Sequence, residues 1–376
     1  MQHRLNMGMI GGGPGSFIGP IHRIAAELDR EITLVAGVFS SDPHRSRQAA
    51  DLYRIDPERA YPDLPTMFAA ERARADGVDF VSIVTPNFNH LESARAALAA
   101  GLPVMTDKPM TATMAQAVEL AGHVRAAALP FAVSYTYSGY PLVREARARI
   151  AAGAIGTIRK IVVEYPQGWL SGAAEGKQAE WRLDPARGGM GGCIADIGVH
   201  AFHLAEFVSG LSVTQLLADL GTVVPGRLLD DDCTLLLRFS NGARGVLLAS
   251  QIEMGEQNGL RLRVYGDDGA LIWRQEEPNR LIQHHGDGRT SLIRAGEEGL
   301  SAAAQAATRT PGGHPEGYLE AFANLYRDFA AVLRGGHAPC LPMLDDGLRG
   351  MALIETAVTA SRANAGWVAF DGKGLG

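Results

Sequence analysis

The chain has 376 residues, of which 46% are hydrophobic and 20% are charged, and its formal net charge is −6. This length predicts two domains with sizeable cores, and the negative charge speaks against a nucleic-acid or anionic-membrane partner. The isolated cysteines Cys193, Cys233 and Cys340 fit a reducing cytoplasm and speak against a disulfide framework or a cysteine-rich zinc site. No apolar run is long enough to cross a bilayer, and no signal-peptide segment is apparent.

The first third of the chain alternates between short apolar runs and helical patterns. Strands are predicted at 4–10, 32–39, 78–86, 102–109 and 130–135, and helices at 21–30, 42–53, 90–101 and 113–127. This order predicts a parallel, doubly wound sheet of the Rossmann type, in which ligands bind outside the carboxyl ends of the strands. The unusual segments all follow predicted strands, at 11–19, 40–42, 85–90 and 107–109. Because these ends meet at one edge of the sheet, we expect a binding site there.

The stretch IGGGPGSFIG at 10–19 lies between the first strand and the first helix, which is the context of a dinucleotide-binding turn. Its spacing departs from G-x-G-x-x-G, because the third position after Gly11 and Gly13 falls on Ser16. We therefore expect a lengthened loop whose glycines admit the pyrophosphate and whose helix N-terminus presents free N–H groups. A plain strand-to-helix turn is the alternative. The predicted contacts in this loop are Gly11, Gly13, Gly15, Ser16, Phe17 and Ile18.

The end of the second strand bears on the choice of cofactor. Serine 40 stands where an acidic residue would bind the ribose hydroxyls of NAD. Asp42 would accept these hydroxyls slightly later or serve only as a helix cap, whereas Arg45 and Arg47 would suit the 2′-phosphate of NADP. We expect NAD, with NADP possible. The other predicted cofactor contacts follow strand ends and are Ser40, Ser41, Asp42, Arg45, Thr85, Pro86, Asn87, His90, Asp107 and Lys108.

The remaining two thirds predict a domain of a different kind. Helices are expected at 140–153 and 193–210, strands at 158–165, 212–224, 231–240, 243–253, 260–267, 269–275 and 279–285, and a long loop over 284–315. Hairpin signals between strands predict a large, mainly antiparallel sheet, whose second face needs cover by helices or by another subunit. Two more helices are expected at 316–333 and 345–366. We therefore divide the α/β chain into a dinucleotide-binding Rossmann domain over 1–135 and an α+β domain with an open sheet, for substrate binding and oligomerisation, over 136–376.

Three residues suit the chemistry of alcohol oxidation. Lys108 lies at a strand end, and Asp196 and His200 are four residues apart on a predicted helix, so they share one face. His200 would act as general base and Lys108 would stabilise the alkoxide, while hydride passes to a nicotinamide ring. Asp196 would orient the substrate or tune the lysine. Structural alternatives exist, because such a pair on a helix is often a surface pair or a cap, and D-K-P at 107–109 is also an ordinary turn. His200 and His203 would suit a metal, but no third ligand is apparent, so we expect none.

At these motifs the chain resembles the Gfo/Idh/MocA oxidoreductases, along essentially its whole length. The matching pieces are the glycine loop with His22 after it, VSIVTPNFNH, AAGLPVMTDKP and GGMGGCIADIGVHAFHL. The family's E-K-P is D-K-P here, Lys108 matches its catalytic lysine, and Asp196 and His200 match its D-x-x-x-H pair. The resemblance implies a Rossmann domain plus an open-sheet domain, NAD or NADP, dimers or tetramers through the sheet face, and sugars or cyclitols as substrates. The lengthened glycine loop departs from the family's usual fingerprint.

Substrate contacts are expected from aromatic and amide side chains on segments that lead toward the presumed cleft. Aromatic faces pack on the C–H faces of sugar rings, and amide and guanidinium groups bind hydroxyls. Such residues are Tyr135, Tyr137, Tyr165, Gln167, Trp169, Trp181 and Arg182. Arg182 would also pair with an acidic substituent, and His314 would reach the site from the same chain or a neighbouring one. Core packing, a place at the rim and, for His314, a capping role are the alternatives.

The sequence therefore predicts a cytoplasmic NAD(P)-dependent dehydrogenase that forms a homodimer or homotetramer. It would oxidise a secondary hydroxyl of a sugar, cyclitol or sugar derivative to a ketone. One alternative is an NAD-dependent enzyme that cleaves glycosides through transient oxidation at C3 followed by elimination. A second alternative is a non-catalytic protein that senses the cofactor.

Overall fold

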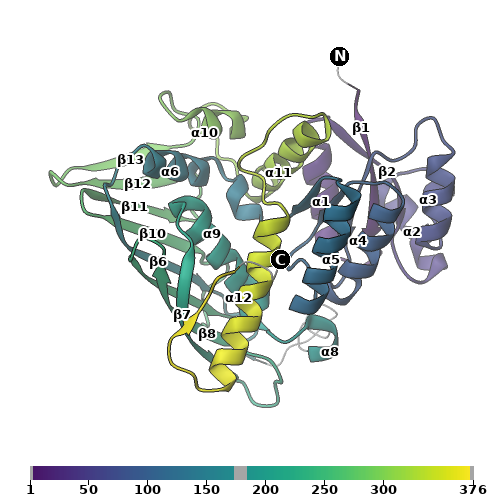
Figure 1. Ribbon diagram of the computed structural model, residues 1–376. Helices are drawn as coiled ribbons and strands as arrows, with labels where there is room; N and C mark the ends of the chain where they lie inside the picture. The colour runs from purple at the N-terminus through teal and green to yellow at the C-terminus, as the bar shows by residue number, and fades with distance from the viewer. Residues whose placement is uncertain (1–2, 173–183, 373–376) are drawn as a thin grey trace. The chain divides into compact units, whose positions relative to one another are not determined.

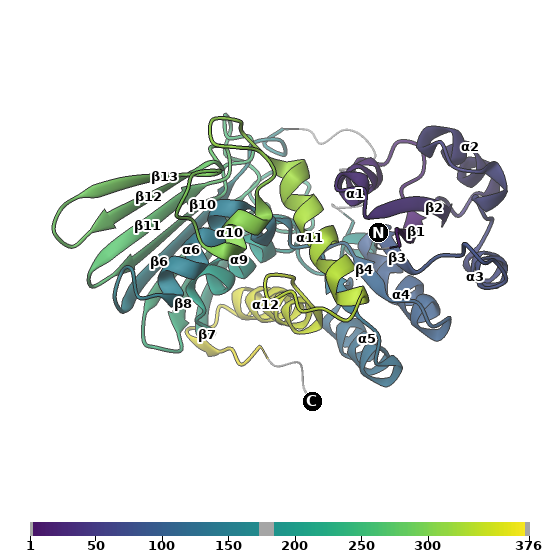
Figure 2. The same ribbon diagram turned by 90° about the horizontal axis from the view of Figure 1, so that it is seen from above.

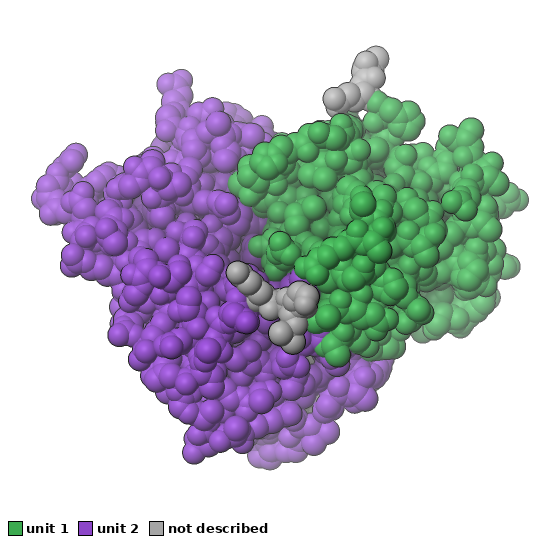
Figure 3. All heavy atoms as spheres, in the orientation of Figure 1, with its two compact units in different colours: residues 1–111, 115–136, 318–347 green, residues 112–114, 137–317, 348–376 purple. Residues whose placement is uncertain are grey.

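A computed structural model describes residues 3–172 and 184–372. The chain forms two compact units: unit 1 contains residues 1–111, 115–136 and 318–347, and unit 2 contains residues 112–114, 137–317 and 348–376 (Figure 3). The division predicted from the sequence placed 318–347 in the C-terminal domain, whereas these residues return to unit 1 in the structure. Within the described ranges, no helix is both long enough and apolar enough to cross a membrane.

Unit 1 is built on a parallel sheet, of which β1 and β2 are labelled in Figure 1. Its described strands follow the order β2-β1-β3-β4-β5. The strands are β1 (Leu5–Gly11), β2 (Ile32–Val38), β3 (Phe80–Val84), β4 (Val104–Thr106) and β5 (Phe131–Val133). The helices are α1 (Ile18–Glu27), α2 (Pro43–Tyr53), α3 (Leu64–Arg72), α4 (His90–Ala99), α5 (Met114–Ala127) and α11 (Tyr318–Leu333). The strand order reverses at β1, so the carboxyl ends of β1 and β3 flank a switch point of the kind where doubly wound folds bind ligands.

The core of unit 1 explains why residues so late in the chain belong to it. Met7 and Met9 of β1 are fully buried, and α11 adds Phe322 and Phe329 to the same apolar cluster. Apolar side chains recur along α11 at helical spacing, which gives it one face to bury. That face packs alongside α1 (Figure 2). The sequence predicted this helix but could not show which sheet it would cover.

Unit 2 is dominated by a sheet whose described strands follow the order β13-β12-β11-β10-β6-β9-β8-β7-β14. Neighbouring strands are antiparallel except β6 and β9, which are parallel. The strands are β6 (Ile158–Pro166), β7 (Val213–Gly221), β8 (Asp232–Phe239), β9 (Arg244–Ser250), β10 (Arg261–Gly266), β11 (Gly269–Arg274), β12 (Arg280–His285), β13 (Thr290–Arg294) and β14 (Val368–Ala369). The helices are α6 (Pro141–Ala151), α8 (Pro185–Gly188), α9 (Val199–Ser209), α10 (Ala302–Ala307) and α12 (Leu344–Arg362).

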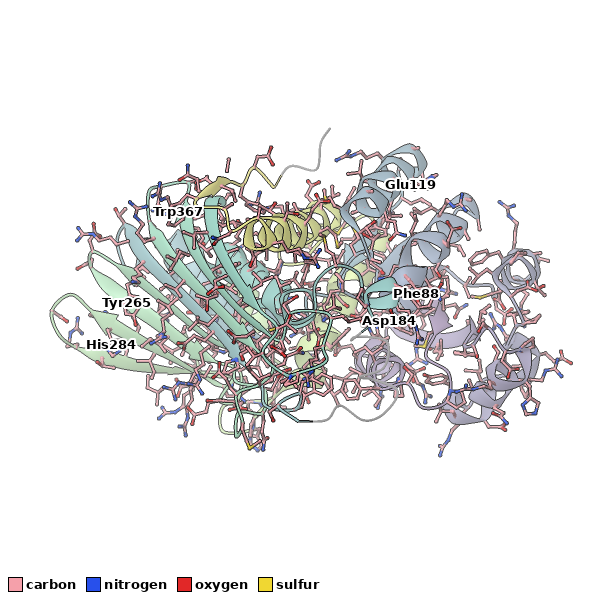
Figure 4. All side chains as sticks on the ribbon, turned by 90° about the horizontal axis from the view of Figure 1, so that it is seen from below. Phe88, Glu119, Asp184, Tyr265, His284 and Trp367 are labelled. Carbon is pink, nitrogen blue, oxygen red and sulfur yellow. The ribbon has the colours of Figure 1, made fainter. Side chains whose placement is uncertain are left out.

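The two faces of this sheet differ. α6 and α9 contact its strands on one face, where the buried Gln283 accepts a hydrogen bond from Arg149 of α6 (2.9 Å). Tyr265 on β10 and His284 on β12, labelled in Figure 4, occupy the opposite face, because both pair across to Ala270. Tyr265 is half-buried and His284 is exposed. The predicted α/β fold, with a parallel sheet and a large, mainly antiparallel one, is confirmed.

Three local features differ from what the sequence predicts. The long loop expected over 284–315 contains β13 and α10, because Gly288 adopts a positive φ of 87° and closes a hairpin from β12. Helix α3 was not predicted, although Asp63 caps it by accepting a hydrogen bond from the Thr66 N–H (2.8 Å). The helix expected from residue 193 begins as a π-helix, η4 (Ile194–Gly198), before α9.

Candidate active site

The glycine loop of unit 1 packs tightly against the protein at Gly13 and leaves open space at Gly15. Gly11, Gly12 and Gly15 have positive φ angles of 92°, 80° and 82°. A Cβ on Gly13 would lie 2.6 Å from the Phe39 carbonyl oxygen, whereas a Cβ on Gly15 would meet nothing within 4 Å. Phe17, at the N-cap of α1, supplies no side-chain cap and is 59% exposed. The bare backbone and the helix N-terminus fit the pyrophosphate of a dinucleotide.

Gly19 takes the place of the third glycine of the fingerprint, although it is not among the cofactor contacts predicted from the sequence. α1 begins at Ile18, three residues earlier than predicted, so Gly19 lies in its first turn. A Cβ on Gly19 would lie 2.5 Å from the Gly12 Cα and 2.6 Å from the Tyr53 hydroxyl oxygen. The Tyr53 hydroxyl donates a hydrogen bond to the Gly12 carbonyl (2.5 Å). The pair Gly12–Gly19 therefore lets the helix approach the strand closely, as the third glycine does in the usual fingerprint.

The end of β2 lies against the same loop. Asp42 caps α2, since its Oδ1 accepts hydrogen bonds from the main-chain N–H groups of His44 (2.9 Å) and Arg45 (3.5 Å). The Arg45 guanidinium donates to the Pro14 carbonyl (3.1 Å), which ties α2 to the glycine loop. Ser40 Oγ accepts a hydrogen bond from the Asp42 N–H (3.2 Å), and Ser41 beside it is exposed. Of the two roles weighed for Asp42, the structure shows the cap.

The end of β4 carries Asp107 and Lys108. The Asp107 carboxylate accepts hydrogen bonds from the Lys108 main-chain N–H (2.9 Å) and the Ser134 hydroxyl (2.8 Å). The Nε2 atom of His22 lies 3.9 Å from the same oxygen. Burial acts to raise the pKa of this carboxyl, but the neighbouring His22, Lys108 and Ser134 groups outweigh it and hold that pKa well below its usual range. The side chain is therefore a carboxylate at neutral pH.

The segment after β3 combines a buried histidine with an exposed turn. His90 is buried, with Nε2 2.9 Å from the Thr85 carbonyl oxygen and Nδ1 2.9 Å from the Pro109 carbonyl oxygen. Its ring thus joins the end of β3 to the D-K-P segment. Pro86 precedes the 3-10 turn η2 (Asn87–Asn89), in which Asn87 is buried. Phe88 in the same turn is partly exposed (Figure 4).

Unit 2 holds a cluster of uncharged polar side chains that we call the tyrosine–amide cluster: Tyr137, Tyr165, Gln167, Trp169 and Asn258. Asn258 Oδ1 accepts hydrogen bonds from the Tyr165 hydroxyl (2.7 Å) and the Gln167 amide (2.9 Å). Its amide nitrogen donates to the Tyr137 hydroxyl (3.3 Å), which also bonds to the Tyr165 hydroxyl. The Trp169 indole N–H donates to Gln167 Oε1 (2.9 Å), and Trp169 is 45% exposed. Burial raises the pKa of Tyr137, which therefore stays protonated at neutral pH.

Two of the predicted catalytic residues lie beside this cluster, on η4 and α9. The His200 ring meets the Tyr137 ring edge to face, with centroids 4.9 Å apart. Asp196 lies in the π-helical turn, an irregularity that often marks functional sites, and its Oδ2 accepts a hydrogen bond from Gln251 (2.9 Å). The Asp230 carboxylate fixes the start of this helix by accepting the N–H groups of Gly192 (2.6 Å) and Ile194 (2.7 Å).

The remaining predicted substrate residues have different surroundings. Tyr135 belongs to unit 1 and is buried, which raises the pKa of its hydroxyl. His314 is exposed, and its carbonyl accepts a hydrogen bond from the Thr310 hydroxyl (2.8 Å). Trp181 and Arg182 lie outside the described residues.

Sequence reasoning missed Asn258, Gln251 and Asp230. Asn258 sits in a loop between two strands and Gln251 directly follows β9, and neither position carries a motif. Asp230 opens a run of three aspartates whose last member begins β8, and this run was a signal that could have been followed. Among the described residues, no group of three or more histidine, cysteine or acidic side chains is arranged to hold a metal.

Comparison with known proteins identifies both parts of the chain. Residues 5–135 match the family model of oxidoreductases with an NAD-binding Rossmann fold, and residues 143–272 match the GFO/IDH/MocA C-terminal domain. The uncharacterized oxidoreductase YfiI of Bacillus subtilis is 32% identical, over 97% of each chain. The levoglucosan dehydrogenase of Pseudarthrobacter phenanthrenivorans is 26% identical, over 98% of each chain.

Solved structures agree with these matches. An inositol dehydrogenase homolog from Azotobacter vinelandii complexed with NAD+ is 34% identical, over 98% of each chain, with a TM-score of 0.94. Its complex with NADH and myo-inositol matches with 33% identity over 98% of each chain and a TM-score of 0.90. The predictions of a nicotinamide cofactor and of an oxidoreductase are therefore confirmed.

Substituting Gly19 by alanine is expected to weaken NAD binding by roughly tenfold or more. The added Cβ would collide with Gly12 and Tyr53 and displace the loop; overpacking of this kind costs about 1–3 kcal/mol, and about 1.4 kcal/mol is a tenfold change in Kd. Fluorescence titration with NAD measures the effect. Gly122→Ala is the matched control, because a Cβ on that α5 residue would meet nothing within 4 Å. Equal Kd values for both variants would contradict the role given to the Gly12–Gly19 contact.

Proposed function

Because the chain belongs to the Gfo/Idh/MocA family of NAD-binding oxidoreductases, we propose that it oxidises a secondary hydroxyl of a neutral cyclitol or sugar to a ketone. The observation that carries this proposal is the tyrosine–amide cluster beside His200. Its hydrogen bonds are made by hydroxyl and amide groups, which both donate and accept, and by an indole N–H, which donates. These groups match the hydroxyls of a polyol. NAD, when bound, accepts hydride from the carbinol carbon.

The roles of the chain's own residues follow from their chemistry. His200 takes the proton of the reacting hydroxyl, since a neutral imidazole is a good base near neutral pH. The Lys108 ammonium stabilises the developing alkoxide by charge and hydrogen bonding. Asp196, whose carboxylate is oriented by Gln251, positions a substrate hydroxyl or the lysine.

The cluster also favours a ring-shaped, uncharged substrate. Trp169 is fixed through its indole N–H, which leaves its partly exposed ring to pack on the C–H face of a sugar or cyclitol. Tyr165 and Gln167 supply the polar contacts to its hydroxyls. The names of two similar proteins support this class, since one structure was solved with myo-inositol and one relative is a levoglucosan dehydrogenase. Arg182, Trp181, Tyr135 and His314 remain proposed contacts on the strength of the sequence alone.

The cofactor is proposed to lie along the strand ends of unit 1. The loop residues Gly11 to Ile18 would hold the pyrophosphate, and Ser40, Ser41, Asp42 and Arg45 would surround the adenine ribose. Because no carboxylate stands directly at Ser40, NADP remains a second cofactor to test. Residues 85–90 and the D-K-P segment would line the nicotinamide end.

The wider setting of the enzyme is proposed from its sequence and fold. The half-exposed face of the large sheet, which carries Tyr265 and His284, suits contact with a second copy of the chain in a homodimer or homotetramer. The cysteine usage suits the cytoplasm. We assign dinucleotide binding to residues 1–135 together with the returning segment 318–347. Substrate binding and oligomerisation fall to the rest.

The test offers the enzyme NAD, and then NADP, with a panel of cyclitols, sugars, anhydrosugars and glycosides. Absorbance measures the reduced cofactor, and mass spectrometry identifies the products. Net reduction with a keto product is the expected result. Glycoside cleavage without net reduction would replace the proposal by transient C3 oxidation and elimination. Cofactor binding without turnover across the panel would favour the non-catalytic alternative.

The same assay tests the tyrosine–amide cluster with a matched pair of variants. Tyr137→Phe removes a hydroxyl bonded to Tyr165 and Asn258, and we expect kcat/KM to fall about tenfold, the loss of roughly 1.4 kcal/mol. Tyr140→Phe is the control, because Tyr140 stacks on Tyr137 but its hydroxyl accepts a hydrogen bond from Gln275 (3.2 Å). Equal effects of the two variants would argue against the cluster as the substrate site.

A further inference from the structure

We propose that His22 is a positioning residue for Lys108, acting through the Asp107 carboxylate from inside the core of unit 1. The inference rests on the proposed function, because it takes Lys108 as the residue that stabilises the alkoxide. His22, Ser82 and Tyr326 together form what we call the His22 brace. They come from α1, β3 and α11, and each is at most 1% exposed.

The brace fixes the imidazole from one side. His22 Nδ1 lies 2.6 Å from the Tyr326 hydroxyl and 3.1 Å from the Ser82 hydroxyl, and these two hydroxyls are themselves 2.8 Å apart. The Phe322 ring packs edge-on against the imidazole, with centroids 4.6 Å apart. Three mutually bonded polar groups and one aromatic contact leave the ring a single orientation.

That orientation aims the other nitrogen at the catalytic segment. His22 Nε2 is buried and makes no hydrogen bond to the described residues, yet it lies 3.9 Å from Asp107 Oδ1. A buried polar nitrogen without a hydrogen bond lowers the stability of the fold, so the orientation of Nε2 toward Asp107 does not stabilise the brace itself. Its effect falls on the carboxylate, because an imidazole edge in a dry environment interacts strongly with a nearby negative charge.

Asp107 transmits this constraint to the lysine. The same Oδ1 that faces His22 accepts the main-chain N–H of Lys108, and Ser134 donates to it as well. On the far side of the segment, His90 Nδ1 contacts the Pro109 carbonyl oxygen. The main chain is thus fixed on both sides of Lys108. The Asp107 carboxylate, which faces the His22 imidazole, precedes it, and the Pro109 carbonyl, which contacts the His90 imidazole, follows it.

The burial of every member decides between a brace and a proton path. A proton path through the brace would need an exposed end beyond Asp107, whose side chain is 17% exposed, whereas Ser82, His22 and Tyr326 are all enclosed. Burial also raises the pKa of the Tyr326 hydroxyl, which keeps it protonated. The network therefore acts by holding geometry, and its loss should appear in the chemical step.

Two substitutions of His22 separate the roles of its nitrogens. His22→Asn keeps an amide near the Nδ1 position, toward Ser82 and Tyr326, and removes the group that faces Asp107. His22→Gln places its amide near the Nε2 position instead. We expect kcat at saturating substrate and NAD to fall roughly 10²-fold in His22→Asn, the usual effect of misplacing a reacting group by about 1 Å, and less than about tenfold in His22→Gln. The Kd for NAD should change less than about threefold in both.

Tyr326→Phe guards against a variant that does not fold, because it removes one hydroxyl and keeps the ring. Its kcat should fall several-fold, whereas Tyr61→Phe, which removes a buried hydroxyl bonded to Glu71 (2.8 Å), should lower the melting temperature without changing kcat. An unchanged kcat in folded His22→Asn and Tyr326→Phe would overturn the inference. Lys108→Ala in the same assay separates the two proposals. If it keeps full turnover, the role of Lys108 fails and the role of His22 fails with it, whereas if it loses turnover while the His22 and Tyr326 variants keep it, only the role of His22 fails. The proposed function itself fails if the wild-type enzyme reduces neither NAD nor NADP with any substrate of the panel.

Discussion

Replacing Lys108 by alanine is expected to lower kcat by roughly 10²–10³-fold while leaving NAD binding nearly unchanged, the loss typical of one removed donor to a developing oxyanion. The lysine follows Asp107 at the carboxyl end of β4, where doubly wound folds bind ligands. An alkoxide forms only as the proton leaves, so a cation that meets it contributes to the transition state more than to the ground state. The effect should therefore appear in kcat and kcat/KM alike.

Steady-state rates with a substrate found in the panel, together with a fluorescence titration of NAD, check this expectation. Lys160→Ala is the matched control, since that lysine is exposed on β6 and lies away from the cluster residues of unit 2. Normal turnover by Lys108→Ala would remove the lysine from the mechanism. A parallel loss of NAD affinity would instead show that the side chain serves the cofactor.

The strand ends of unit 1, where we propose that the cofactor binds, could be predicted from the sequence because their signals are local. Apolar runs that stop at Pro86 and Pro109 mark strand ends, and parallel pairing gathers those ends at one edge. Asp42 before Pro43 likewise reads as a cap in sequence and is a cap in the structure. The glycine loop was recognised by its context, although its spacing concealed that Gly19 takes the packing role of the third glycine.

The other contacts could not be predicted because they join distant parts of the chain. His22 and Tyr326 are 304 positions apart, and their contact exists only because α11 returns to pack on α1. Asn258 reaches Tyr137 across 121 positions and Tyr165 across 93. Such pairs leave no periodicity or motif, since they depend on which faces of two elements meet. The sequence thus pointed to the residues proposed to carry reactive groups but not to the contacts around them.

The helix that carries Asp196 and His200 likewise has a feature that the sequence did not predict, its π-helical start. The spacing of Asp196 and His200 predicted one regular helix with both side chains on one face, but Asp196 lies in η4 and His200 in α9. Asp230 holds the first N–H groups of this segment from 36 and 38 positions away. The irregular turn therefore depends on a partner from a separate strand connection, which a helical pattern does not reveal.

Replacing His200 by asparagine is expected to lower kcat roughly 10²–10⁴-fold, the range for loss of a general base, and to remove the rise of rate with pH. Only the neutral imidazole can accept the hydroxyl proton, so wild-type oxidation should increase as rising pH removes the proton from the imidazole. The variant lacks this group, so its slower rate should no longer follow that titration.

Profiles of kcat/KM against pH for wild type and variant test this prediction, with His203→Asn as the matched control on the same helix. His203 stacks on Phe207, with centroids 5.7 Å apart, whereas His200 meets Tyr137 of the tyrosine–amide cluster. The control should therefore keep the wild-type profile even if it unfolds at a lower temperature. A His200→Asn profile that still rises through the same pH range would assign the base elsewhere. The carboxylate of Asp196, held by Gln251, would then be the next candidate for the base, and Asp196→Asn would be the variant that flattens the profile.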